Sequence, residues 1–191
     1  KEALAAVIKR HGLLLLEDDI YAFITAGVLP EYGRPLRELL PERTLYLCGT
    51  SKSLCSGLRV AYLVFPPRLQ EKIYRALFNI NVKTSSFDAE VITELIKSGG
   101  AEVIAGRKMA LAKEANALFA RYFPHARSGH PHSFFRWLPL PAGKDPDRAE
   151  SELLKMGVRV FHSGRFSCGR NDGGDFLRVS LASANSLREL E

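Results

Sequence analysis

A run of four leucines followed by three acidic residues limits the folds that this chain can adopt. Leu13 to Leu16 form a continuous apolar segment, and Glu17, Asp18 and Asp19 follow directly. Continuous apolar runs of this length are typical of strands buried on both faces, which occur in parallel sheets covered by helices. The pattern therefore predicts a parallel strand with acidic side chains at its carboxyl end, where open α/β sheets bind ligands.

The rest of the chain shows two successive patterns of helices and strands. The first predicts a helix over 2–11, strands at 44–48 and 59–65, and helices over 66–80, 86–98 and 101–123. The second predicts a strand at 133–140, a helix over 146–156, a strand at 158–160, a turn at 171–174, a strand at 176–181 and a last helix from 185. We therefore predict an α/β chain in two parts, in which residues 1–98 end a sheet domain and residues 99–191 form a small α+β domain.

The composition excludes several classes of protein. The net charge of +6 comes from scattered arginines, so we expect a solvated surface with a few anion-binding arginines rather than a nucleic-acid face. No apolar run approaches the roughly 20 residues that span a bilayer, and we expect no membrane segment. Three cysteines without zinc-site spacing favour a reducing cytoplasm. His130 and His132 have no cysteine or acidic pattern beside them, so we expect no metal site.

A loop of small residues from Gly49 to Arg59 lies between two apolar runs and contains Lys52. A lysine at the end of a buried strand is costly to desolvate, and burial with a nearby cation favours the neutral amine. Such an amine is a nucleophile that can form a Schiff base. Arg59 adds a planar guanidinium that suits a phosphate group. An amine and a phosphate-binding arginine on one loop suggest a pyridoxal phosphate bound through Lys52.

Asp18 and Tyr21 stand at the carboxyl end of the first predicted strand. A pyridine ring acts as an electron sink when its nitrogen stays protonated, and a buried carboxylate keeps it so. A phenol three residues further on is able to hydrogen-bond the ring hydroxyl. The alternative is that the acids simply end the strand and cap the next turn. Lys52 and Arg59, at the ends of the following strands, favour the cofactor site.

Three segments, taken in order, resemble the class I/II aminotransferases, which are fold-type I pyridoxal-phosphate enzymes. They are Asp18-Asp19-Ile20-Tyr21, Ser51-Lys52 with Arg59 seven residues after the lysine, and Phe176-Leu177-Arg178-Val179-Ser180. The resemblance covers nearly the whole chain. It implies the C-terminal part of the family's large domain, mainly a parallel sheet with helices, followed by its small α+β domain. It also implies a pyridoxal 5'-phosphate cofactor.

The resemblance implies a role for each cofactor-site residue. Lys52 would form the internal aldimine and move the proton between the substrate α-carbon and the cofactor C4′. Asp18 would pair with the pyridine nitrogen, and Tyr21 would bond the ring 3-oxygen. Arg59 would hold the phosphate. The family often has a serine where this chain has Gly49, so Ser51 or backbone amides are expected to complete the phosphate site.

The resemblance also implies a substrate site in the second part of the chain. Arg178 would bind the substrate α-carboxylate, which an arginine fork does well. Phe134, together with Phe135 and Trp137, resembles the strand that faces the substrate side chain, although for Trp137 we expect core packing. That strand usually begins with glycines in the family, whereas this chain has a histidine and a serine there, at 132 and 133.

Transamination between an amino acid and a 2-oxo acid is the function that the resemblance implies. Both ends of the sequence lie within helix patterns, so we expect a fragment that is inactive alone, from an enzyme that is a homodimer when complete. The alternative is the aminotransferase-like effector domain of a winged-helix transcriptional regulator, which binds nucleic acid only through a domain before residue 1. A receiver domain is excluded because no βα units fit between the acids and Lys52.

Overall fold

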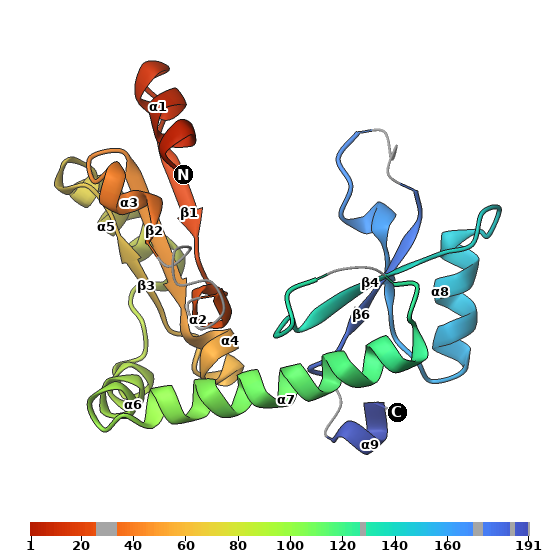
Figure 1. The fold of residues 1–191 in the computed structure, drawn as a ribbon. Helices are drawn as coiled ribbons and strands as arrows, with labels where there is room; N and C mark the ends of the chain where they lie inside the picture. Colours follow the sequence, from red (N-terminus) through yellow and green to blue (C-terminus); the bar gives the residue numbers. More distant parts are fainter. Residues whose placement is uncertain (26–33, 127–128, 170–173, 184–185, 191) are drawn as a thin grey trace. The chain divides into compact units, whose positions relative to one another are not determined.

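The chain forms two compact units, residues 1–108 and 109–191. The computed structural model describes all residues except 26–33, 127–128, 170–173, 184–185 and 191 (Figure 1). The division falls inside the long helix α7 (Gly100–Tyr122), which contributes residues to both units. The sequence predicts the boundary after residue 98, whereas the contact-based division lies after residue 108, inside the continuous helix α7. The predicted domain boundary therefore stays a prediction.

The first unit contains a three-stranded sheet of order β1-β2-β3 (Figure 1). Its strands are β1 (Leu15–Asp18), β2 (Thr44–Gly49) and β3 (Ala61–Val64). β1 and β2 are parallel, whereas β2 and β3 are antiparallel. The α-helices are α1 (Glu2–Arg10), α2 (Ala22–Thr25), α3 (Leu36–Leu39), α4 (Thr50–Ser53), α5 (Gln70–Asn81) and α6 (Ser86–Lys97). The described residues of this unit also form the 3₁₀ turns η2 (Ser56–Leu58) and η3 (Pro67–Leu69).

The four-leucine run is not the strand buried on both faces that the sequence predicts. β1 begins at Leu15, and Leu13, Leu14 and Leu16 are 49%, 54% and 63% exposed. Among the described residues, β1 pairs on one side only, with β2, and only its Leu15 packs against the cluster formed by residues of α1 and α3 with Leu40. The predicted acidic carboxyl end is correct, since Asp18 is the last residue of β1.

A second cluster fixes the segment after β2. Leu54, Val60 and Ile92 are buried together, and Leu58, Leu95, Ala101 and Ile104 pack against them. α6 begins with the Ser85 hydroxyl, which accepts a hydrogen bond from the Asp88 backbone N–H at 3.4 Å. By contrast, α5 has no buried residue. In the part of the chain that the structure describes, no helix is both long and apolar enough to cross a membrane.

The second unit is a small antiparallel sheet of order β4-β6-β5, with β4 and β6 side by side in Figure 1. Its elements are β4 (Phe135–Pro139), α8 (Pro146–Lys155), β5 (Phe161–His162), the 3₁₀ turn η4 (Ser163–Arg165), β6 (Phe176–Ser180) and α9 (Leu187–Leu190). The helix predicted over 146–156 is α8, and it is capped by Asp145, whose carboxylate accepts from the backbone N–H groups of Asp147 and Arg148 at 2.9 and 3.2 Å.

Two elements of this unit have bounds that differ from those predicted from the sequence. The strand predicted at 158–160 is wrong: the paired residues are Phe161 and His162, because they lie opposite Arg178 and Leu177 of β6. The helix predicted from 185 is assigned from Leu187. Most of the turn predicted at 171–174 lies outside the described residues.

The small sheet has two different faces. Leu138 and Val179 pack on one face against the cluster of Ala115, Phe119 and Leu181, which includes residues of α7. Residues directly opposite each other in an antiparallel ladder share a face. The other face therefore carries Trp137 and Phe161, which both lie opposite Arg178, and also Phe135 and Phe176. Core packing was the wrong expectation for Trp137, which is 43% exposed and contacts the rings of Phe166 and Phe176.

Candidate active site

Three consecutive acids at the end of β1 have three different environments. Glu17 accepts hydrogen bonds from the backbone N–H groups of Leu36 and Arg37 at 2.7 and 3.1 Å, and so caps the first turn of α3. Asp19 accepts the Tyr46 hydroxyl at 3.1 Å. Burial and the charge of Asp19 raise the pKa of Tyr46 far above its usual value, so this phenol stays a donor. Sequence reasoning missed both partnerships because the partners lie 19 to 27 residues away.

Because Glu17 and Asp19 have partners within the protein, Asp18 is the one of these three acids that is available to bind a ligand. Its carboxylate accepts one hydrogen bond, from the Ile20 backbone N–H at 3.4 Å, and pairs with no cation among the described residues. Its side chain is exposed in this chain, whereas a buried carboxylate is expected for the partner of a pyridine nitrogen. Tyr21 follows in the turn before α2; it is half-buried, and its carbonyl accepts the Ile24 N–H at 3.1 Å.

The loop that contains Lys52 is closed by two hydrogen bonds to a single carbonyl. The buried hydroxyl and the backbone N–H of Thr50 both donate to the Val60 carbonyl, at 2.8 and 3.1 Å. The Leu54 and Val60 side chains, packed with Ile92, anchor the loop from inside. We call residues 50–60 the lysine loop. Both Lys52 and Arg59 lie on it, so the two cations predicted to bind one cofactor are held by one closed backbone segment.

Lys52 itself lies in the short helix α4, directly after β2, and is half-buried. The carbonyl oxygens of Lys52 and Leu54 both accept hydrogen bonds from the Lys108 ammonium, at 3.1 and 2.5 Å. Burial lowers the pKa of Lys108; Cys55 opposes the shift, and the charge of Lys52 adds to it. Lys108 therefore places a second positive charge next to the backbone of the lysine loop. The sequence did not identify it, because it lies 54 to 56 residues downstream in a helix with no local motif.

Arg59 has an unusual backbone conformation. Its φ and ψ are 52° and 30°, in the left-handed region that favours glycine. An L-residue there costs about 1–2 kcal/mol, and such strain persists where the surrounding structure enforces it, often at functional sites. The buried neighbour Val60 and the Thr50 hydrogen bonds enforce it here. The guanidinium is exposed and makes no ion pair with any residue that the structure describes, so it is available for an anion.

Gly49 cannot be replaced by a larger residue without local movement. A Cβ atom at this position would lie 3.1 Å from Cγ2 of Ile20, closer than most real contacts. The absence of the serine that the related family often has is therefore linked to the packing of Ile20 beneath the start of α4. Ser51, which is half-buried on the lysine loop, keeps its place as the predicted phosphate hydroxyl.

Arg178 lies on the second unit, among aromatic rings. Its guanidinium carbon is 4.7 Å from the ring centre of Phe135, 5.6 Å from that of Phe161 and 4.5 Å from that of Phe166. Phe134, the predicted substrate-side residue, is buried and lies directly before β4. The structure thus brings Phe135 rather than Phe134 to Arg178, and the substrate role of Phe134 stays a prediction.

The two histidines at 130 and 132 do not form a metal centre within the described chain. Their rings lie 5.6 Å apart, edge to face, and no group of three or more candidate ligands exists in the described ranges. Burial, followed by the neighbouring His132, lowers the pKa of His130. Two imidazoles without a third ligand do not make up the three protein ligands of even an open zinc site.

Comparison with known proteins identifies the family. The chain matches the family described as "Aminotransferase class I and II" over residues 2–190. It therefore belongs to the class I and II aminotransferase family, as the ordered motifs around Asp18, Lys52 and Arg178 predict.

Two kinds of relative are similar to this chain. An uncharacterised HTH-type transcriptional regulator of Bacillus subtilis, YdeF, is 30% identical across 100% of the chain, which spans 41% of that protein. The 2-aminoadipate transaminase of Thermus thermophilus is 28% identical over 96% of the chain and 48% of the enzyme. The crystal structure of LysN, the α-aminoadipate aminotransferase of Thermus thermophilus complexed with N-(5'-phosphopyridoxyl)-L-leucine, has a TM-score of 0.79 at 25% identity and covers 99% of the chain and 50% of LysN.

The chain thus has the C-terminal part of the fold-type I architecture, and it spans about half the length of the relatives it matches. An archaeal alanine:glyoxylate aminotransferase, at 22% identity and a TM-score of 0.82, shows the same fold over 99% of the chain. The fold predicted from the sequence is confirmed.

Proposed function

We propose that the complete protein is a pyridoxal-phosphate-dependent aminotransferase. One observation carries the proposal: Lys52 and Arg59 lie on the same closed loop, beside the strand that ends in Asp18. Within the described residues, neither cation has a carboxylate partner and Asp18 has no cation. The amine of Lys52 suits the cofactor aldehyde, the guanidinium of Arg59 suits its phosphate, and the carboxylate of Asp18 suits its pyridine nitrogen. These three side chains therefore fit the cofactor.

Each residue has a defined task in this proposal. Pyridoxal phosphate, when bound, supplies an electron sink for the bond that breaks at the substrate α-carbon. Lys52 would hold the cofactor through its amine and, once the substrate amine has displaced it, would act as the general base at the α-carbon. Asp18 would keep the ring nitrogen protonated, and Tyr21 would bond the ring oxygen. Arg59 and Ser51 would hold the phosphate, and Arg178 would bind the substrate carboxylate in the plane of its guanidinium.

The proposed substrates are an amino acid and a 2-oxo acid. The 28% identical relative is a 2-aminoadipate transaminase, which supports this class of reaction without defining the substrate side chain. We also propose a homodimer in the cytoplasm. The free thiols of Cys48, Cys55 and Cys168 support a reducing compartment, and the exposed apolar side chains of α5, such as Phe78 and Ile80, support a partner surface.

The central test concerns Lys52. Borohydride reduction of the complete protein with bound cofactor should leave a pyridoxyl group on the peptide that contains Lys52, detected by mass spectrometry. Lys52→Ala should abolish this label, whereas Lys113→Ala, a matched change at an exposed lysine of α7, should retain it. A label that persists in Lys52→Ala would sink the assignment.

The second candidate is an effector domain of a transcriptional regulator, and the 30% identical relative YdeF favours it. Both candidates use the same cofactor site, so the label at Lys52 does not separate them. A screen of amino-acid donors with measurement of the 2-oxo acid does. Product from any donor supports the enzyme; a labelled complete protein that yields no product and binds its own promoter DNA supports the regulator.

A further inference from the structure

The aromatic side chains around Arg178 form a structure that the proposed catalytic roles do not explain. Phe135 comes from β4 and Phe161 from β5, the strands on either side of β6, and Phe166 follows η4. All three ring centres lie within 4.5 to 5.6 Å of the Arg178 guanidinium carbon. We call these three rings the arginine collar. A guanidinium next to aromatic rings is attracted by their negative faces and still has its in-plane N–H groups for hydrogen bonds.

Arg178 lacks the partner that usually orients an arginine. In the described parts of the second unit, no carboxylate or carbonyl accepts a hydrogen bond from its guanidinium. Other arginines of this unit differ: Arg148 pairs with Glu152 and Arg165 pairs with Glu150. The orientation of Arg178 thus depends on the collar, while its N–H edge remains available for a carboxylate that arrives from outside.

Phe166 is the collar member that no strand holds. It is 47% exposed and is the residue after η4, with its backbone N–H donating to the Ser163 carbonyl at 2.9 Å. It makes the shortest of the three approaches to Arg178, and Trp137 packs edge-on against it at 5.7 Å. Its position over Arg178 therefore requires that η4 itself be fixed.

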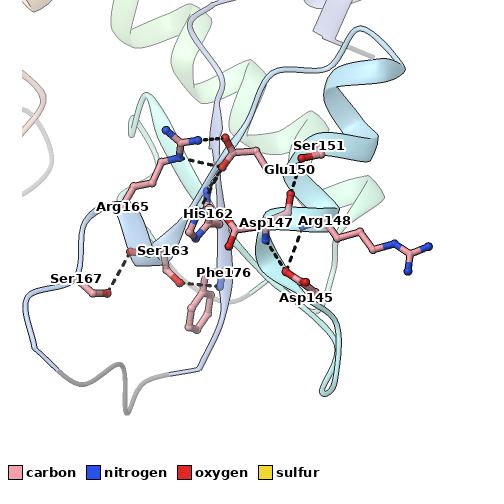
Figure 2. Close-up of polar contacts among 10 residues, drawn as sticks. All are labelled: Asp145, Asp147, Arg148, Glu150, Ser151, His162, Ser163, Arg165, Ser167 and Phe176. Atoms are coloured by element: carbon pink, nitrogen blue, oxygen red, sulfur yellow. Dashed lines mark hydrogen bonds and ion pairs between the residues drawn. The ribbon is translucent and has the colours of Figure 1, made fainter.

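Glu150 of α8 fixes η4 from one side (Figure 2). Its carboxylate accepts the His162 backbone N–H at 3.1 Å and two N–H groups of Arg165, at 3.2 and 2.5 Å. The Glu150 side chain is only 15% exposed, whereas the neighbouring carboxylates Asp147 and Glu152 are 85% and 57% exposed. Glu150 thus joins both ends of the 3₁₀ turn to a stable helix.

Serine hydroxyls fix η4 from the other side, as Figure 2 also shows. The Ser163 hydroxyl accepts the Phe176 backbone N–H at 3.2 Å, and the Ser167 hydroxyl donates to the Ser163 carbonyl at 3.1 Å. Phe176 lies on β6, two residues before Arg178. The turn that carries Phe166 is therefore tied to the strand that carries Arg178.

We propose that Phe166 is a positioning residue for the carboxylate-binding arginine, and that Glu150 acts through η4 to hold Phe166 in place. The ligand class is the carboxylate shared by amino-acid and 2-oxo-acid substrates. The proposal rests on the proposed function, because it needs Arg178 to be the carboxylate-binding group. It gives the ion pair between Glu150 of α8 and Arg165 a functional consequence at Arg178.

The test measures how strongly the complete, cofactor-loaded protein prefers a carboxylate over its neutral amide. The probes are 3-phenylpropionate and 3-phenylpropionamide, and their dissociation constants are measured by calorimetry. Phe166→Leu should weaken carboxylate binding roughly three- to tenfold, in line with the contribution of a partly exposed cation–π contact. Amide binding should stay the same, and Phe166→Tyr should restore the preference. General damage to the pocket would weaken both probes equally.

Two matched controls accompany this measurement. Phe123→Leu removes a similarly exposed ring, 41% exposed, that packs on Phe119 rather than on Arg178, and should leave the preference intact. Glu150→Gln should reduce the preference partly, because the amide oxygen still accepts the His162 N–H but loses the charge opposite Arg165. Glu152→Gln, on the exposed side of the same helix, should have no effect.

The outcomes separate this inference from the proposed function. A wild-type protein without the Lys52 label, or without any carboxylate preference, overturns the proposed function and this inference with it. A labelled wild-type protein whose preference survives in Phe166→Leu overturns the inference alone. A preference lost equally in Phe166→Leu and Phe123→Leu also overturns it, because the effect would then not depend on the collar.

Discussion

The link between Lys108 and the lysine loop leads to a quantitative prediction. Lys108→Met keeps most of the apolar stem of the side chain but removes the ammonium that bonds the carbonyls of Lys52 and Leu54. Hydrogen bonds to a charged group contribute about 1.5–3 kcal/mol each. Burial of the ammonium opposes this gain, as the lowered pKa of Lys108 indicates. We therefore expect a net loss of about 1.5–3 kcal/mol in the free energy of local opening of the loop, rather than the full sum of two bonds.

The assay is amide hydrogen exchange of the peptide that covers residues 50–58, in the complete protein. Because each 1.4 kcal/mol is a factor of ten, exchange should accelerate roughly ten- to hundredfold in Lys108→Met. The borohydride-trapped cofactor at Lys52 should decrease in parallel. Lys113→Met is the control: it removes the same charge from the same helix, at an exposed position. Equal exchange in the two variants would refute the reasoning.

Two further predictions concern Arg59 and Glu150. Arg59→Gly should leave the free energy of unfolding within about 1 kcal/mol of wild type, because relief of the left-handed strain offsets the added chain entropy of glycine. The affinity of this variant for pyridoxal phosphate should nevertheless fall. A large loss in the free energy of unfolding would contradict this account. Burial alone would raise the pKa of Glu150, but the His162 N–H and Arg165 outweigh it and hold that pKa below its usual value. Its stabilising effect is therefore present above the unfolded-state pKa and is lost as the pH falls through the lower folded-state pKa, so Glu150→Gln should flatten the acid side of a denaturation curve measured below about pH 5.

Local signals in the sequence predict the elements and the residues that depend on neighbours in the chain. Asp145 and Pro146 define the start of α8, and Lys52 and Arg59 lie in a loop bounded by two strands, as predicted. Predictions that depend on distant partners do less well. β5 is displaced from 158–160 to Phe161 and His162 because pairing with β6 decides its register, and no local pattern encodes that pairing.

The same limit applies to the candidate site. Leu16 and Asp18 are exposed in a strand that pairs on one side only among the described residues, and an apolar run does not reveal such pairing. Core packing is the wrong expectation for Trp137 because strand pairing places it opposite Arg178, and its residue type does not encode that pairing. Lys108 and Glu150 act through backbone groups far along the chain, so their residue types alone carry no signal.

Residues of one chemical type are distinguished in this protein by what their neighbours leave unsatisfied. Glu17 caps a helix and Asp19 binds Tyr46, so among the three consecutive acids 17–19 only Asp18 keeps a carboxylate without a strong partner. Arg165 is held by Glu150, whereas Arg178 is held by rings that accept no hydrogen bond in the plane of its guanidinium. An ion pair would have oriented Arg178 equally well, but it would have occupied the N–H groups that a carboxylate ligand needs. Aromatic contacts orient the charge without neutralising it, which is the physical reason to expect a carboxylate at Arg178 and none at Arg165.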